Sequence, residues 1–410
     1  MPAEMFPALL AVSAAAPGAP LAQTDIWDEF YAPVFADVPH ARRLFVEANT
    51  VGRRHLNWDP RTAFQDGFPP VGPRVDAWER CALDLGRRTL PAVLTGQDRS
   101  RVGTFIMVSS TGYACPGPDS QLVAELGLRP DVRRVFVGHM GCYAALVGLR
   151  AGADALAARP DELVLLTCVE VTSAHLRGEA TREQAVVHGL FGDACASVLL
   201  GTVPGGPSLP AAPALAGPGP AGTRLTSDTR LAADAEAAAD TWPAGDTGIA
   251  GDAALAGDTA VAVGAQVLAT RTEVTPGTSE HMSIRIHEDG FRLRLSPAIP
   301  SLLRAGTPGF VDRLLAGTGV GVEDVRHWVL HPGGPRIIDA VGDAFGLSDA
   351  QLRPSRETLR DYGNCSSVTV LLALRRLMSG AAGERPAPGD HAILLAFGPG
   401  LTTEAALVRF

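Results

Sequence analysis

The sequence contains no lysine, so every one of its 35 basic residues is arginine. This absence excludes chemistry that needs a primary side-chain amine: a Schiff-base lysine, a pyridoxal phosphate anchor or the lysine of a Walker P-loop. The arginines form no long basic cluster, and the formal net charge is −9. Nucleic acid is therefore not an expected partner.

Long apolar runs and paired cysteines are also lacking. No window holds 18 consecutive apolar residues, so we expect no transmembrane helix and no membrane partner. The cysteines form no CxxC pair and have no regular spacing, which disfavours a metal site or a disulfide framework and agrees with a cytoplasmic location. The apolar N-terminal stretch lacks a positive region, carries Glu4 and is broken by prolines. We therefore expect a strand at 8–13 rather than a signal peptide.

The remaining sequence predicts an α/β protein. Residues 1–202 alternate apolar runs with helical patterns, which is typical of βαβ units with buried parallel strands. The expected strands are 103–110, 132–139 and 161–172, and the expected helices are 37–56, 73–89 and 142–157. Residues 203–262 are rich in Ala, Gly, Pro, Asp and Thr and contain the near-repeat AGDTGI, AGDAAL, AGDTAV. We interpret them as a flexible surface insertion, with a short partner-binding repeat coil as the alternative.

The α/β pattern resumes over 263–410 and matches the first part. GCYAALVGLRAGADAL from Gly141 and GNCSSVTVLLALRRLM from Gly363 both begin with a glycine and small residues before a leucine-rich helix. Two apolar strands follow each helix. The pattern predicts two duplicated halves, 1–202 and 263–410, whose helix N-termini meet near a pseudo-twofold axis. The alternative is that two α/β segments merely look alike at this level.

Three polar residues are candidates for chemistry. Cys142 lies at the first turn of a predicted helix, where the helix dipole would lower its pKa and favour a thiolate nucleophile; the alternative is a packed core cysteine. His331, in WVLHPGGPRII, ends an apolar strand before a glycine turn and is an acid/base candidate or else a structural histidine. Asn364, in YGNCSS, begins a helix as an N-cap or as an amide donor to an oxyanion.

Six motifs extend these three sites: VGHMGCYAAL, EVTSAHL, LFGDACAS, LHPGGPRIIDAV, YGNCSSVTVLLAL and AFGPGLTTEAALV. Together they resemble the chalcone synthase superfamily, the type III polyketide synthases, over nearly all of 8–202 and 263–410. The insertion departs from the family pattern. The resemblance implies a thiolase fold, with duplicated βαβαβ halves in a five-layered α-β-α-β-α core, and a homodimer.

The resemblance also implies the catalytic roles. Cys142 matches the nucleophile that accepts the acyl group, and His331 matches the imidazole that pairs with it. Asn364 matches the amide that polarises the malonyl carbonyl, and Phe191 matches a gating residue between the CoA tunnel and the cavity. The implied substrates are an acyl-CoA starter and malonyl-CoA, with no cofactor or metal.

Further positions are implied for substrate and CoA. The cavity positions are Ser110, Thr111, Cys115, Thr172, His175, Ile284, Leu293, Ser366, Gly398 and Pro399. The expected CoA-phosphate contacts are Arg42, Arg43, Arg53 and Arg54, whose alternative is an ordinary solvated helix face. Leu293 replaces an aromatic wall, Ile284 fills space and His175 adds a bulky polar group, which together argue against a p-coumaroyl starter. Cys115 is expected to reach across the dimer interface.

The product class stays open between related chemistries. FRLRLSPAIPSLL, at 291–303, resembles bacterial enzymes that make alkylpyrones or alkylresorcinols from fatty acyl-CoA, and we expect a pyrone or resorcinol-type product. A malonyl-primed tetrahydroxynaphthalene-type synthase is the near alternative. A ketoacyl-ACP synthase III shares the Cys-His-Asn set, but HPGGPRI and the GPG loop disfavour it. A non-catalytic scaffold is disfavoured because all three candidate residues are present.

Overall fold

The computed structural model describes residues 5–63, 69–176, 179–205, 259–287 and 290–410. The predicted insertion at 203–262 lies almost entirely outside the described residues. The strands are β1 (Met5–Ala15), β2 (Leu21–Ala22), β3 (Arg53–Arg54), β4 (Val102–Ser109), β5 (Arg133–Gly138), β6 (Leu163–Glu170), β7 (Ala194–Pro204), β8 (Val261–Val274), β9 (Met282–His287), β10 (Gly290–Leu295), β11 (Val325–Leu330), β12 (His391–Gly398) and β13 (Thr402–Arg409).

The helices are mostly placed between these strands. They are α1 (Gln23–Ile26), α2 (Ala32–Val34), α3 (Pro60–Ala63), α4 (Val71–Val93), α5 (Pro118–Glu125), α6 (Ala144–Ala158), α7 (Arg182–Leu190), α8 (Ile299–Leu315), α9 (Pro335–Phe345), α10 (Asp349–Tyr362) and α11 (Thr369–Ser379). A π-helical turn, η2, spans Arg43–Glu47, and short 3-10 turns include η4 (Thr172–His175) and η6 (Ser366–Val368).

Nine of the described strands form one mixed sheet in the order β11-β12-β13-β8-β1-β7-β6-β4-β5. In the N-terminal half, β1 pairs antiparallel with β7, β7 pairs antiparallel with β6, and β6 pairs parallel with β4. The C-terminal half repeats these directions for β8 with β13, β13 with β12, and β12 with β11. The predicted duplication is therefore confirmed, and the antiparallel β1–β8 pair joins the two halves.

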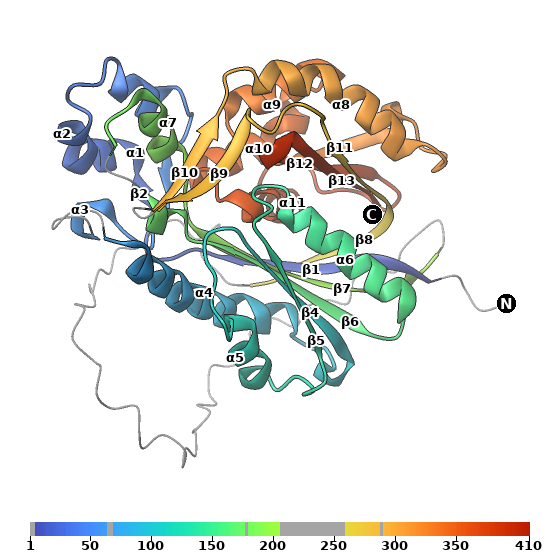
Figure 1. The fold of residues 1–410 in the computed structure, drawn as a ribbon. Coiled ribbons are helices and arrows are strands. Elements are labelled where there is room, and N and C mark those ends of the chain that lie inside the picture. The colour runs from blue at the N-terminus through green and yellow to red at the C-terminus, as the bar shows by residue number, and fades with distance from the viewer. Residues whose placement is uncertain (1–4, 64–68, 177–178, 206–258, 288–289) are drawn as a thin grey trace, which may run out of the picture.

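Helices α6 and α11 form the central layer between the two halves of the sheet. Both contribute to one core cluster that also contains residues from strands of both halves. On the outer faces, α4 packs against β1, β6 and β7, whereas α8 packs against β8 and β13. Figure 1 shows α4 and α5 on the lower side, α8 and α9 at the top, and α6 and α11 between them. The order of layers is the α-β-α-β-α arrangement expected of a thiolase fold.

Small residues allow the central helix α6 to approach the sheet closely. A Cβ atom on Gly148 would lie 2.6 Å from Leu166 Cδ1 and 3.1 Å from Val108 Cγ2, so no larger residue fits there without movement. The strands β4 and β6 beneath it are buried along their whole length. Such continuous apolar strands are typical of sheets covered on both faces. The helix that follows Cys142 is thereby fixed in the interior.

Most predicted elements are present, with one clear error. The expected strand at 8–13 is β1, and the helices expected at 73–89 and 142–157 are α4 and α6. The helix predicted over 37–56 is wrong: the segment contains the π-helical turn η2 and the strand β3. Positive φ angles at His40 (62°) and Thr50 (55°) interrupt the helical backbone on either side of η2. Among the described helices, none has the length and apolarity needed to cross a membrane.

Candidate active site

A cavity of about 360 Å³ lies between the two halves, and Cys142, His331 and Asn364 all line it. This volume falls in the range of small-molecule sites in proteins. The sequence-predicted residues that line it with these three are Ser110, Thr111, Thr172, His175, Phe191, Ile284, Leu293, Ser366 and Pro399. Chain segments separated by more than 200 residues thus contribute to one cavity.

Cys142 is presented by a tight turn between β5 and α6. Gly141 has a φ of 77°, and a Cβ atom there would lie 2.7 Å from Pro399 Cδ, so the turn requires glycine on both grounds. The Gly141 amide donates a 2.8 Å hydrogen bond to Ser110 Oγ at the end of β4. The nucleophile candidate is therefore held by the two neighbouring strand ends rather than by a mobile loop.

His331 follows the last residue of β11 and is 1% exposed. Its backbone amide donates to the Leu395 carbonyl at 2.7 Å, which extends the pairing of β11 with β12. Within the described part of the chain, neither ring nitrogen has a hydrogen-bond partner. The ring lines the cavity and therefore brings an unused hydrogen-bonding capacity to it.

Asn364 lies in the turn between α10 and α11, next to Gly363. Its Oδ1 accepts hydrogen bonds from the Ser366 amide at 2.8 Å and from Thr369 Oγ1 at 3.4 Å. These contacts assign the oxygen and therefore leave Nδ2 as the group that donates. Nδ2 makes a long hydrogen bond to the Gly333 carbonyl, at 3.4 Å. The two readings of Asn364 are thus compatible: its oxygen caps the turn while its amide hydrogens remain donors.

Burial governs the charge states of Cys142 and His331. Desolvation is the main reason why the pKa of the Cys142 thiol is raised to about 12, and the nearby Glu170 charge acts in the same direction. Hydrogen bonds to Ser366 and Asn364 lower the pKa in part. Desolvation also lowers the pKa of His331 to about 3. The expectation that Cys142 has a lowered pKa is corrected, because burial in this cavity raises it instead.

Each of these shifts disfavours an isolated charge. Transfer of the Cys142 proton to His331 would instead create a thiolate and an imidazolium together. Their attraction in a medium of low dielectric would offset part of the desolvation cost of both. The cavity therefore favours the neutral thiol and the neutral imidazole over either charged group alone.

Glu170, at the end of β6, is a site residue that the sequence analysis missed. Its carboxylate is fully buried and accepts hydrogen bonds from the Ser110 amide at 3.0 Å, Thr111 Oγ1 at 2.7 Å and Ser367 Oγ at 2.5 Å. A carboxylate with several donors can remain ionised in the interior even though burial raises its pKa. The signal was a glutamate as the last residue of a mostly apolar strand.

The β9–β10 hairpin forms one wall of the cavity. Ile284 and Leu293 pair directly across its two strands. The two residues at which the sequence differs from the chalcone synthase pattern therefore form one apolar surface. Phe291, also missed by the sequence analysis, lines the cavity and stacks on His175 with ring centroids 3.8 Å apart. Burial lowers the pKa of His175 to about 4, so the ring is neutral at pH 7. The Arg292–Glu179 ion pair also links this hairpin to the N-terminal half.

Two predicted cavity residues lie outside the lining. Cys115 is exposed in the loop after β4. Gly398 is buried beneath the cavity, where an added Cβ would lie 2.5 Å from Tyr143 Cδ1. Its role is to allow close packing against the residue after Cys142.

The structure does not bring the four predicted CoA arginines to the cavity. Arg42 is exposed and pairs with Glu47, and Arg43 is also exposed. Arg53 pairs with Asp361, and Arg54 is fully buried. The prediction for Arg54 is wrong because β3 turns its side chain into the interior, away from any phosphate at the surface.

Arg336 is a cation that the sequence analysis overlooked. It is the one arginine among the described residues that line the cavity, and its side chain is exposed. It lies in the first turn of α9, where backbone amides and the helix dipole favour anions. The signal was an arginine directly after the HPGGP turn.

Comparison with known proteins agrees with this geometry. Models of the N-terminal and C-terminal domains of chalcone and stilbene synthases match residues 6–204 and 266–410. The 3,5-dihydroxyphenylacetyl-CoA synthase of Streptomyces toyocaensis is 32% identical over 83% of this chain and 74% of its own length. The 1,3,6,8-tetrahydroxynaphthalene synthase of Streptomyces peucetius subsp. caesius is 30% identical over 92% of this chain and 85% of its own length.

More distant relatives complete the comparison. The alpha-pyrone synthesis polyketide synthase-like Pks18 of Mycobacterium tuberculosis is 25% identical over 80% of this chain and 69% of its own length. The solved structure of 1,3,6,8-tetrahydroxynaphthalene synthase from Streptomyces coelicolor A3(2) superimposes with a TM-score of 0.76 at 22% identity, covering 98% of this chain and 99% of that one. That likeness shows the fold.

The surroundings of Cys142 predict opposite shifts for two variants. Glu170→Gln removes a charge that raises the thiol pKa, so its alkylation profile is expected to move to lower pH. Ser366→Ala removes a hydrogen bond that lowers the pKa, so its profile moves to higher pH. A hydrogen bond to a charged group is worth about 1.5–3 kcal/mol, or about one to two pKa units.

The measurement is the pH dependence of iodoacetamide alkylation, resolved by peptide mass so that exposed Cys115 is counted separately. Thermal unfolding of both variants serves as the control for folding. Shifts of the same sign in both variants would contradict this account of the thiol.

Proposed function

The chain belongs to the chalcone and stilbene synthase family, the type III polyketide synthases, and from this premise we propose that it extends an acyl-CoA starter with malonyl-CoA. Membership makes it a condensing acyltransferase that uses CoA thioesters. In our proposal the starter acyl group is carried on Cys142, extended by repeated decarboxylative condensation, and cyclised to a pyrone or resorcinol-type product. The single observation that carries this is the convergence of Cys142, His331 and Asn364 on one apolar cavity.

The proposed loading step uses the neutral pair described above. The Cys142 proton passes to the His331 ring as Sγ attacks the thioester carbonyl. The carbon–sulfur bond to CoA then breaks, and the CoA thiolate takes up the proton. His331 and the Asn364 amide are the donors available to the tetrahedral oxyanion. Their support is the unpartnered ring of His331 and the fixed orientation of Asn364.

The proposed extension step uses the same donors on a different anion. Loss of CO2 from malonyl-CoA leaves an enolate on the thioester oxygen. A donated hydrogen bond from Asn364 Nδ2, together with His331, stabilises that enolate where little water competes. The enolate carbon then attacks the Cys142 thioester and displaces the thiolate, so the chain grows by two carbons.

An aliphatic starter is supported by the cavity walls. Most of the lining side chains are apolar, and the aliphatic ones among them include Leu44, Val186, Val187, Leu190, Met282, Ile284, Leu293, Leu295, Ile299 and Ile337. Transfer of an alkyl chain from water to such walls contributes about 0.8 kcal/mol per buried CH₂. A charged or strongly polar starter would gain nothing comparable.

A malonyl-primed tetrahydroxynaphthalene-type product is the second candidate. It is favoured by the 30% identity to a tetrahydroxynaphthalene synthase over 92% of this chain. The ketoacyl-ACP synthase III alternative is set aside, because both matching domain models belong to chalcone and stilbene synthases.

Products distinguish the two candidates directly. The purified protein is incubated with malonyl-CoA alone and with acyl-CoA starters from acetyl to palmitoyl and benzoyl. We expect products whose mass tracks the starter plus two or three ketide units, less what cyclisation expels, with none from Cys142→Ala. A single pentaketide from malonyl-CoA alone would establish the second candidate instead. Absence of any ketide product in the unmodified protein would reject both.

CoA recognition is proposed to use Arg336 rather than the predicted arginines. A guanidinium at the first turn of α9 suits a phosphate group. Arg336→Ala is expected to raise KM for malonyl-CoA about tenfold, since a charge-assisted hydrogen bond contributes about 1.5–3 kcal/mol. KM for the N-acetylcysteamine thioester of malonate, which has no phosphate, should not change. An equal rise for both substrates would argue that Arg336 shapes the cavity instead.

A homodimer is proposed from the exposed edge strand β5. Val135 and Phe136 on this strand are 41% and 38% exposed, and Met140 and Tyr113 nearby are 39% and 60% exposed. An unpaired apolar edge is normally covered in solution. In sedimentation equilibrium we expect twice the chain mass of 42.7 kDa, and a Phe136→Glu variant shifted towards monomer. A monomeric unmodified protein would reject this assembly.

A further inference from the structure

The segment Gly52–Arg54 lies next to the turn that carries Asn364. We call this segment the arginine bracket. Arg54 is fully buried, and its Nη1 donates a 2.7 Å hydrogen bond to the Phe191 carbonyl. Its guanidinium carbon lies 5.2 Å from the centre of the Phe45 ring in η2. Within the described residues, its Nε and Nη2 have no hydrogen-bond partner. Arg54 is thus a buried cation whose guanidinium makes one hydrogen bond to the described residues, to the backbone of a cavity residue.

Phe191 is in turn paired with Asn364 through the backbone. The two residues form a parallel bridge outside the main sheet. The Asn364 amide donates to the Leu190 carbonyl at 2.8 Å, and the Gly192 amide donates to the Asn364 carbonyl at 3.1 Å. Because these backbone hydrogen bonds join the two segments, a movement of the Phe191 carbonyl also moves the backbone of Asn364.

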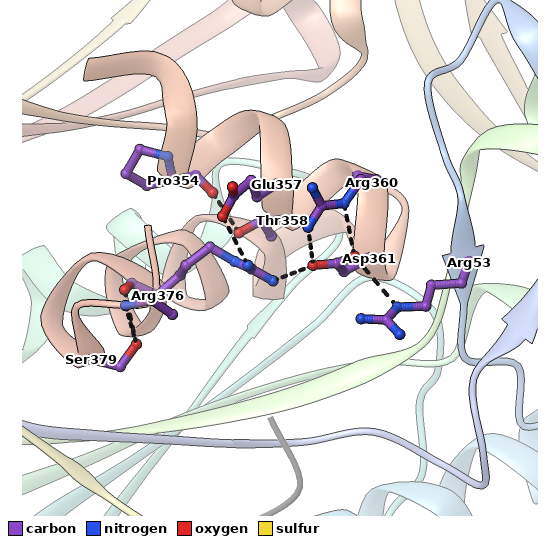
Figure 2. A network of polar contacts seen from close by, with 9 residues as sticks. Arg53, Pro354, Glu357, Thr358, Arg360, Asp361, Arg376 and Ser379 are labelled. Atoms are coloured by element: carbon purple, nitrogen blue, oxygen red, sulfur yellow. Dashed lines mark hydrogen bonds and ion pairs between the residues drawn. The ribbon is translucent and has the colours of Figure 1, made fainter. Parts of the chain in front are cut away.

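Gly52 and Arg53, the other residues of the arginine bracket, contact the last turn of α10, which directly precedes the turn that carries Asn364. The Gly52 amide donates to the Arg360 carbonyl at 2.8 Å, and Arg53 Nε lies 3.4 Å from Asp361 Oδ1. Asp361 also pairs with Arg360 and, at 2.7 Å, with buried Arg376 of α11. Figure 2 shows Asp361 at the end of its helix with the three arginines directed at it. Asp361 has three arginine partners, so the loss of one of them leaves two in place. The Phe191 carbonyl, in contrast, receives its side-chain hydrogen bond from Arg54.

We propose that Arg54 is a positioning residue for the condensation reaction. Through the Phe191 carbonyl it sets the location of the Phe191 side chain and of the Asn364 amide, while Gly52 and Arg53 fix the far side of the turn. The assignment rests on the proposed function, which gives Phe191 and Asn364 their roles. It replaces the predicted role of Arg54 as a ligand of CoA phosphate.

Loss of stability has to be separated from loss of position. The buried carboxylate of Asp193 attracts the Arg54 charge, so removal of that charge is expected to lower the melting temperature. Met keeps an unbranched side chain at this position, so we expect Arg54→Met to fold at the assay temperature, which thermal unfolding checks. A displacement of about 1 Å at a catalytic group can cost about 10²-fold in rate. Retained fold with lost turnover is the combination that separates positioning from packing.

The test compares two acyl donors in four proteins. Wild type, Arg54→Met, Arg54→Lys and the remote control Arg87→Gln are assayed with malonyl-CoA and with the malonyl N-acetylcysteamine thioester. Arg87 is an exposed residue of α4 paired with Glu125. For Arg54→Met we expect kcat to fall about 10- to 100-fold with both donors, with KM near the wild-type value. Arg54→Lys should recover part of kcat, because an ammonium can still donate to the Phe191 carbonyl, and Arg87→Gln should match wild type.

A rise in KM confined to malonyl-CoA would overturn the inference in favour of a phosphate ligand. Unchanged kcat in Arg54→Met would overturn it as well. Hydrogen exchange of peptides that contain Gly192 and Asn364 provides a second readout that needs no turnover. Their amides should exchange faster in Arg54→Met than in wild type, and unchanged exchange would overturn the inference even if the wild type makes no polyketide. Failure of wild-type turnover by itself rejects the proposed function.

Discussion

The Glu170 carboxylate is the interaction on which the site depends. It binds donors at the end of β4 in the N-terminal half and Ser367 in the turn before α11 in the C-terminal half. Ser110, whose amide it accepts, also receives the amide of Gly141 in the cysteine turn. One buried anion therefore ties the turn of Cys142 to the turn of Asn364 across the pseudo-twofold axis. Because an unpaired buried carboxylate is costly, loss of any of these donors weakens the mutual placement of the two turns.

The apolar cavity determines the chemistry that this placement permits. Withdrawal of water raises the pKa of Cys142 and lowers that of His331, so neither group carries an isolated charge at neutral pH. The same lack of water strengthens every hydrogen bond to an oxyanion or enolate that forms beside His331 and Asn364. The arginine bracket, together with Asp361 and its arginine partners, holds the turn that carries Asn364. The lack of water thus makes the hydrogen bonds from His331 and Asn364 strong, and the rigid backbone around Asn364 determines where they point.

The sequence predicted those parts that depend on local pattern. Cys142, His331 and Asn364 each follow a strand or begin a helix with a glycine within two residues, and the duplicated halves were visible because each repeats one helix and two strands. Features that depend on tertiary environment were missed. The dipole argument for Cys142 could not include the desolvation caused by distant walls. Arg54 was predicted to be a surface cation because no local sequence pattern shows that β3 directs this side chain into the interior. Arg336, by contrast, was accessible to sequence reasoning, since its position after the HPGGP turn already placed it at a helix N-terminus near His331.

The central claim is that Cys142 carries the acyl group in this cavity. The most direct measurement is a rapid acid quench after mixing the protein with an acyl-CoA starter of medium chain length in the absence of malonyl-CoA, followed by digestion and mass mapping. The account predicts the acyl mass on the peptide that contains Cys142, and its loss from that peptide once malonyl-CoA is added before the quench. An acyl group on exposed Cys115 alone, or ketide products formed with Cys142 unmodified at every time point, would contradict it.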